Sequence, residues 1–157
     1  MQAAKAADAY GLVDGHSVEC ADGESAYTQA KFIGTPTWIT IRDRDRWPDF
    51  WFHDGAKRQK PKFDDPCCRL KKALYGHPDS GGYWEQHCER QLTKPDIGFI
   101  AIHEAWKSVF WHPKLKLMLV VYVDDFKLSG PKENLKKGWE LIGKYITMGP
   151  NGPVGRY

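Results

Sequence analysis

The segment LVVYVDDFKLSG, residues 119–130, restricts the fold more than any other part of the chain. Residues 119–123 form an apolar run that predicts a buried strand, and residues 125–129 alternate as an antiparallel partner strand would. Asp124 and Asp125 stand where the two predicted strands meet. Burying one ionised carboxylate without a partner is costly, and a second carboxylate beside it adds repulsion. The pair must therefore lie in a solvated turn or bind a cation.

The remaining hydrophobic pattern predicts a mixed fold. Besides the strand that contains residues 119–123, which is expected to span 116–123, strands are expected at residues 16–22, 37–41, 98–103 and 107–112. Helices are expected within residues 23–32 and at 83–92 and 131–146. Residues 42–66 are charged and broken by prolines, which predicts a loop with one helical turn near 47–52. This order of elements predicts an α+β fold, in which an antiparallel sheet has its helices packed on one face.

Composition narrows the class of protein only slightly. The 157 residues are 41% hydrophobic and 13% aromatic, which suffices for the core of one domain. A net charge of +3 permits nucleic-acid binding without requiring it. Four cysteines without a disulfide spacing predict a reduced, intracellular protein. The chain has neither a signal peptide nor an apolar run of about 18 residues, so no membrane association is expected.

A third carboxylate, Asp22, ends the predicted strand at residues 16–22. If that strand lies beside residues 116–123 in the sheet, Asp22 and Asp124 converge at one edge. Clustered carboxylates bind Mg²⁺, which prefers hard oxygen ligands and leaves room for substrate phosphates. Two such ions about 4 Å apart form the clamp that polymerases use for phosphoryl transfer. Aspartate is also a common turn residue, so the pair alone has a purely structural interpretation.

Four motifs, taken in this order, resemble the reverse transcriptase domain of copia-type retrotransposons. They are DGESAY from Asp22, CRLKKALYG at residues 68–76, the helix led by Tyr83 and Trp84, and YVDD at residues 122–125. The resemblance implies a polymerase palm with part of the fingers over residues 16–148. Residues 1–15 are expected to be a poorly ordered end, and residues 149–157 a flexible tail rich in Gly and Pro.

The resemblance also implies an activity and a set of residues. The domain would be an RNA-directed DNA polymerase of a retrotransposon polyprotein, extending a primer with dNTPs on an RNA or DNA template. Its catalytic residues and metal ligands, for two Mg²⁺ ions or substituting Mn²⁺, would be Asp22, Asp124 and Asp125. The nucleotide would be bound near Tyr27, Gly23, Glu24 and Asp79. Template and primer would be contacted by Arg69, Lys71, Lys72 and Tyr122.

The chain departs from the family pattern in one loop and in its extent. The family carries L-K-Q-A-P-R after L-Y-G, whereas this chain has HPDSGG at residues 77–82. Asp79 therefore stands where a glutamine is expected to contact the nucleotide. Thumb, integrase and RNase H sequences are missing, so we expect a fragment of a polyprotein, with its other domains as further partners, or a degenerate copy. The alternative is a palm remnant that binds nucleic acid or a protein without catalysis.

Overall fold

The chain forms two compact units. The computed structural model describes residues 2–102 and 106–153. Unit 1 comprises Met1–Lys31 and Lys72–Tyr157, and unit 2 comprises Phe32–Lys71. Unit 1 holds a six-stranded antiparallel sheet with all four described α-helices, and unit 2 holds a two-stranded ribbon. The mixed α+β class expected from the hydrophobic pattern is confirmed.

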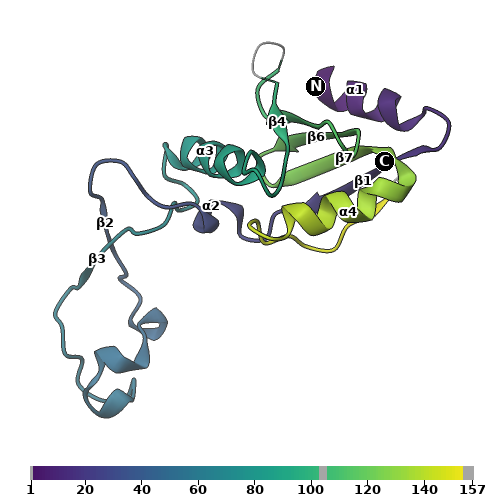
Figure 1. Cartoon of the computed structure of the whole chain (residues 1–157). Helices are drawn as coiled ribbons and strands as arrows, with labels where there is room; N and C mark the ends of the chain where they lie inside the picture. The colour runs from purple at the N-terminus through teal and green to yellow at the C-terminus, as the bar shows by residue number, and fades with distance from the viewer. Residues whose placement is uncertain (1, 103–105, 154–157) are drawn as a thin grey trace. The chain divides into compact units, whose positions relative to one another are not determined.

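The sheet of unit 1 is built from both ends of the chain (Figure 1). Its elements in chain order are α1 (Gln2–Gly11), β1 (His16–Asp22), α2 (Ala26–Gln29), α3 (Ser80–Leu92), β4 (Ile100–Ala101), β5 (Val109–His112), β6 (Leu117–Tyr122), β7 (Asp125–Pro131), α4 (Lys132–Ile142) and β8 (Gly152–Pro153). The strand order across the sheet is β4-β5-β6-β7-β1-β8. The expectation that residues 16–22 lie directly beside residues 116–123 is therefore wrong, because β7 lies between β1 and β6.

Helices cover both faces of this sheet, which corrects the prediction that they all pack on one face. Phe126 and Leu128 of β7 are fully buried in the cluster that α3 and α4 share. Val120 of β6 points to the other face and is buried against Ala7 of α1. Helix α1 is rich in alanine, and Tyr10 is the one large apolar side chain on the face that it packs against the sheet, so the sequence gives little sign of an apolar stripe. Side chains of a strand alternate between faces, and both faces here are apolar.

Two helices form the larger core. Trp84, Cys88 and Leu92 recur at every fourth residue of α3 and are all buried, as the helical spacing predicts. On α4, Gly138 lies against the sheet so closely that a Cβ atom there would be 2.6 Å from Leu117 Cδ1. A glycine inside a helix costs about 1 kcal/mol relative to alanine. Here it permits the close approach of α4 to the sheet.

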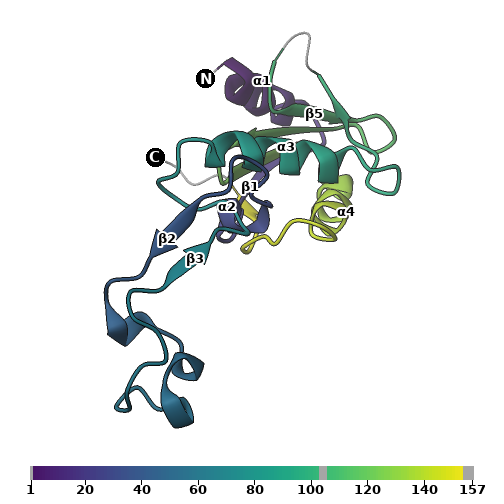
Figure 2. The same cartoon turned by 90° about the vertical axis from the view of Figure 1, so that its left-hand side faces the viewer.

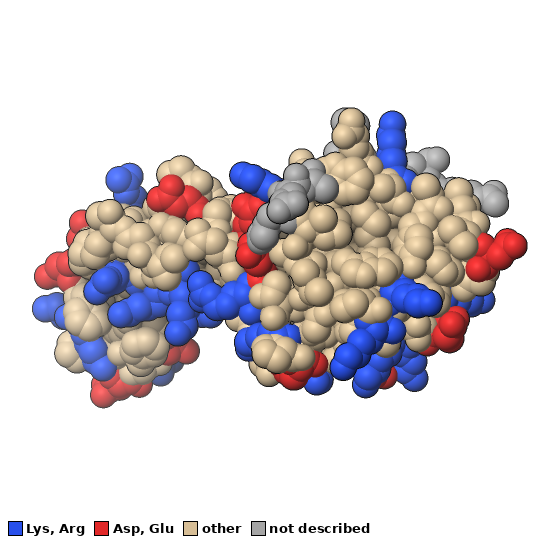
Figure 3. Space-filling model, turned by 45° about the horizontal axis from the view of Figure 1, so that its top comes forward, with Lys and Arg blue, Asp and Glu red and all other residues tan. Residues whose placement is uncertain are grey.

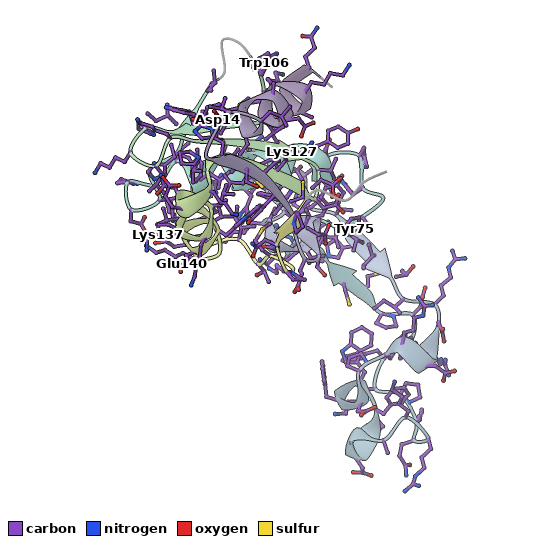
Figure 4. The ribbon with its side chains drawn as sticks, turned by 90° about the vertical axis from the view of Figure 1, so that its right-hand side faces the viewer. Asp14, Tyr75, Trp106, Lys127, Lys137 and Glu140 are labelled. Atoms are coloured by element: carbon purple, nitrogen blue, oxygen red, sulfur yellow. The ribbon has the colours of Figure 1, made fainter. Side chains whose placement is uncertain are left out.

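Both chain ends contribute regular elements among the described residues. Residues 2–11 form α1, whose Asp8 carboxylate is 2.8 Å from Nζ of Lys127 in β7, and Figure 4 labels Lys127. Gly152 and Pro153 form β8 and pair with β1. Parts of the end at residues 1–15 and of the tail at residues 149–157 thus belong to regular elements, and the predicted flexibility of these two ends stays a prediction. Residues 1 and 154–157, and residue 103 of the predicted strand 98–103, lie outside the described residues.

Unit 2 consists of a short ribbon and a series of tight turns. Strands β2 (Trp38–Thr40) and β3 (Cys67–Arg69) run side by side (Figure 2). Three 3₁₀ helices follow β2, where the sequence predicted one helical turn: η1 (Arg44–Arg46), η2 (Asp49–Trp51) and η3 (His53–Gly55). Only Trp47 and Phe52 of this unit are nearly fully buried hydrophobic residues. No helix among the residues that the structure describes has the length and apolarity needed to cross a membrane.

Candidate metal and nucleotide site

Three carboxylates meet where β1 ends and the β6–β7 hairpin turns. The strand register pairs Asp125 with Asp22 on one side and with Tyr122 on the other. Asp124 lies in the turn between the two hairpin strands. One carboxylate oxygen from each of Asp22, Asp124 and Asp125 lies within 4.8 Å of the others. The hairpin and β1 thus bring together residues that are about a hundred positions apart in the sequence.

The turn that carries Asp124 has an unusual backbone. Val123 has a φ of +56°, in the left-handed region that a β-branched residue rarely adopts. Strain of this kind costs on the order of 1–3 kcal/mol and persists only when its surroundings hold it. Two hydrogen bonds do so here. Trp84 Nε1 of α3 donates to the carbonyl of Val123, and the amide of Gly23 donates to the carbonyl of Asp124 at 2.7 Å.

The amide of Gly23 reaches that carbonyl because glycine leaves room beside the turn. A Cβ atom at Gly23 would be 3.3 Å from the Phe126 ring and 3.5 Å from the Trp84 ring. The first distance is slightly tighter than an ordinary van der Waals contact and the second is ordinary, and both rings are buried. A side chain at this position would therefore require the Phe126 ring to shift by a few tenths of an ångström. Gly23 was expected to lie near the nucleotide, and the structure adds a second role for it, which is to hold the turn through its amide.

The cluster places three carboxylates of like charge close together. Partial burial raises the pKa of Asp22 above its ordinary value, and the charges of Asp124, Asp125 and Glu24 raise that pKa further. The ion pairs among the described residues involve none of the three clustered carboxylates. A divalent cation would neutralise this repulsion and find hard oxygen ligands of the kind that Mg²⁺ prefers. The residues present therefore fit a magnesium site.

Gln29, which the sequence did not indicate as a site residue, supports the loop that follows Asp22. Gln29 of α2 donates through Nε2 to the carbonyls of Glu24 at 2.8 Å and Thr147 at 2.9 Å. Its Oε1 accepts from the amide of Thr147 at 2.8 Å. The amide of Gly149 in turn donates to the carbonyl of Asp22 at 2.7 Å. The hydrogen bonds of Gln29 and Gly149 thus hold residues 147–149 beside the loop that follows β1. No sequence motif predicts this role of Gln29.

A cavity adjoins the turn on the side of α3. Its volume is about 270 Å³, and it is lined by Tyr27, Trp84, Phe110 and residues 121–123, among others. The Tyr27 ring lies 4.5 Å from the Tyr75 ring, measured between centroids. Tyr122 is 74% exposed at the rim. The structure therefore places Tyr27 and Tyr122 at one cavity beside the hairpin that carries Asp124.

The other residues expected at the site are distributed differently. Arg69 and Lys71 belong to unit 2, where the Arg69 guanidinium lies 5.9 Å from the centre of the Trp38 ring. Lys72 belongs to unit 1 and donates from Nζ to the carbonyl of Gln29 at 2.9 Å. The Asp79 carboxylate accepts a long hydrogen bond of 3.5 Å from the Tyr83 hydroxyl. Neither Asp79 nor Glu24 belongs to the cluster of three carboxylates.

No family model, curated protein or solved structure matches this chain.

Proposed function

We propose that residues 16–148 form the catalytic part of an RNA-directed DNA polymerase, similar to the palm and part of the fingers of copia-type reverse transcriptases. The observation that carries the proposal is the meeting of Asp22, Asp124 and Asp125 within 4.8 Å at a strained hairpin turn. Strained residues concentrate at functional sites, where the surrounding structure maintains them. The proposed reaction is attack of a primer 3′-hydroxyl, which loses its proton, on the α-phosphate of a dNTP, with cleavage of the bond between the α- and β-phosphates and release of pyrophosphate.

Each part of the site has a proposed task in this reaction. Two Mg²⁺ ions, held by Asp22 and Asp124 with support from Asp125, would lower the pKa of the primer hydroxyl and neutralise charge on the phosphates. Tyr27 would lie under the incoming sugar and exclude a 2′-hydroxyl by its bulk. Trp84 and Gly23 hold the turn, so that the carboxylates keep one geometry throughout the reaction.

A second candidate is a palm remnant that binds nucleic acid or a protein without catalysis. The observation that favours it is Asp79, which stands where the copia-type family has a glutamine that contacts the nucleotide. A carboxylate there would repel a triphosphate. The two candidates differ in activity, and extension of a primer separates them.

The deciding experiment is primer extension on an RNA template with Mg²⁺, repeated with Mn²⁺. The full chain would be compared with Asp22→Asn, Asp124→Asn and the matched control Asp14→Asn. Asp14 lies in the connection between α1 and β1 (Figure 4), and its carboxylate is outside the cluster. We expect the two cluster variants to lose at least about a hundredfold to a thousandfold in rate, as on removal of one electrostatic stabiliser. The control should extend like the wild type.

A metal titration tests the site independently of activity. Mn²⁺ binding, followed by paramagnetic relaxation of water protons, should be lost in Asp124→Asn and kept in Asp14→Asn. Metal binding without any extension would favour the non-catalytic candidate. Full extension by Asp124→Asn would contradict the proposed function.

A further inference from the structure

Charge is unevenly divided between the two units. Unit 2 contains nine Lys and Arg residues and six Asp and Glu residues, whereas the rest of the chain contains fourteen of each kind. The entire formal net charge of +3 therefore comes from residues 32–71. Figure 3 shows many Lys and Arg side chains on the smaller unit, and others along one side of the larger unit. Unit 2 is therefore basic, whereas the rest of the chain has no formal net charge.

One part of unit 2 combines this charge with aromatic rings. The segment KRQKPKF, residues 57–63, has four cations and no acid before Phe63. The amide of Lys62 donates to the carbonyl of Trp51 at 2.8 Å, and Lys62 Nζ donates to the carbonyl of Phe50 at 3.1 Å. The basic segment therefore lies alongside η2. We define the basic–aromatic tip as Phe50, Trp51 and Lys62, which these bonds join, with Phe63, whose ring contacts Trp51, and the cations Arg58 and Lys60 of the same basic segment.

The rings of the tip are uncovered but held in place. Phe50 is 70% exposed and Phe63 is 47% exposed. Trp51 contacts both edge to face, with centroid distances of 6.4 Å to Phe50 and 5.8 Å to Phe63. These contacts orient the two exposed rings while leaving much of their surface open to solvent. Burial of two rings like these would stabilise a free-standing unit, so their exposure favours a binding role.

The cations of the tip are available as well. Arg58 and Lys60 are exposed, and neither side chain has an ion pair or hydrogen bond with the residues that the structure describes. Ordered, exposed rings interleaved with free cations are the combination with which proteins bind single-stranded nucleic acid, because bases stack on the rings and phosphates pair with the cations. A protein partner could also use the rings and Arg58, but three of the four cations in residues 57–63 are lysines, which are depleted at protein interfaces.

We propose that the basic–aromatic tip is a binding site for single-stranded nucleic acid. Bases stack on Phe50 and Phe63, and phosphates pair with Arg58 and Lys60. The site goes beyond the proposed polymerase function because it needs neither the metal nor the carboxylate cluster. Binding at the tip is sequence-tolerant, since every base has a face that can stack.

The test is fluorescence anisotropy of labelled oligo(dT) and oligo(U) with the full chain, in EDTA so that no divalent cation contributes. We expect Phe50→Ala and Phe63→Ala each to weaken binding about tenfold, the scale of one lost base stack. Arg58→Gln and Lys60→Gln should each reduce the slope of log K against log salt by about 0.7. Matched controls in unit 1 are Leu12→Ala, an exposed apolar residue, and Lys132→Gln, an exposed cation.

Several outcomes would overturn the proposal. One is tip variants that bind both oligonucleotides like the wild type. Another is binding that requires Mg²⁺ and disappears in Asp22→Asn, which would place the nucleic acid at the carboxylates. A third outcome is that the chain binds no oligonucleotide but self-associates in sedimentation, and that Phe50→Ala abolishes the self-association. The tip would then be a contact between two copies of this chain. Loss of primer extension with oligonucleotide binding intact would contradict the polymerase function alone.

Discussion

Among the described residues, unit 2 exposes more of its Trp and Phe side chains than unit 1 does. In unit 1, Trp84, Phe110 and Phe126 are buried among the helices and the sheet, and Trp84 also holds the turn that carries Asp124. In unit 2, Trp38, Phe50 and Phe63 are exposed beside cations. A carboxylate cluster requires a rigid body, because its oxygens must keep ångström-scale geometry. A stacking surface only requires oriented rings, so a small unit with a minimal core can carry it.

The largest expected difference concerns the stability of the two units. Trp84→Ala removes a buried indole and its hydrogen bond, so we expect a loss of about 3–5 kcal/mol in the free energy of unfolding. Phe50→Ala removes an exposed ring and should change the same quantity by less than about 0.5 kcal/mol. Urea denaturation followed by far-ultraviolet circular dichroism measures both. Similar losses in the two variants would show that Phe50 contributes to folding as a buried residue does, and would contradict the difference between the two units.

The next effect concerns the side chain that braces the metal site. Gln29→Ala removes three hydrogen bonds to backbone groups, and we expect a loss of about 1–2 kcal/mol in the free energy of unfolding because the site is half-buried. The midpoint of the Mn²⁺ titration should rise, since residues 147–149 would no longer support Asp22. Gln59→Ala in unit 2 is the matched control. An unchanged midpoint in Gln29→Ala would limit Gln29 to a purely structural role.

The third effect tests the strained turn. Val123→Asn places a residue that tolerates a positive φ at a φ of +56°, so the free energy of unfolding should increase by about 1 kcal/mol. Unit 2 provides the contrast. Its Asp54 has a φ of +59° and already belongs to a tolerant residue type, so Asp54→Asn should leave stability unchanged. Thermal denaturation measures both variants, and a loss of stability in Val123→Asn would show that the turn is not strained.

The smallest effect tests repulsion within the cluster. A raised pKa means that folding favours the protonated form of Asp22, so the ionised form destabilises the fold. Asp22→Asn should therefore stabilise the metal-free protein at pH 7 by about 0.5 kcal/mol, a small gain because solvent screens exposed carboxylates. The gain should vanish as the pH falls through the raised pKa of Asp22 to its ordinary value of 3.8. Denaturation at several pH values in EDTA measures it, and Asp14→Asn should show no such dependence.

Local patterns in the sequence predicted most of the elements around the site. The apolar run at residues 119–123 and the alternation at residues 125–129 correspond to β6 and β7. The four-residue spacing of Trp84, Cys88 and Leu92 corresponds to the buried face of α3. These patterns succeed because side-chain burial follows the period of the element itself. The meeting of Asp22 with Asp124 was also expected, although through a direct pairing of β1 with β6 that does not exist.

The sequence by itself determined the α+β class, the hairpin at residues 117–131 and the carboxylates at its turn, because these depend on neighbouring residues. Tertiary structure alone decided that β7 lies between β1 and β6, that α1 covers the second face, and that Gln29 braces the site. It also decided that residues 32–71 form a unit of their own. Such features depend on contacts between distant segments and on backbone hydrogen bonds, and neither leaves a periodic signal in the chain.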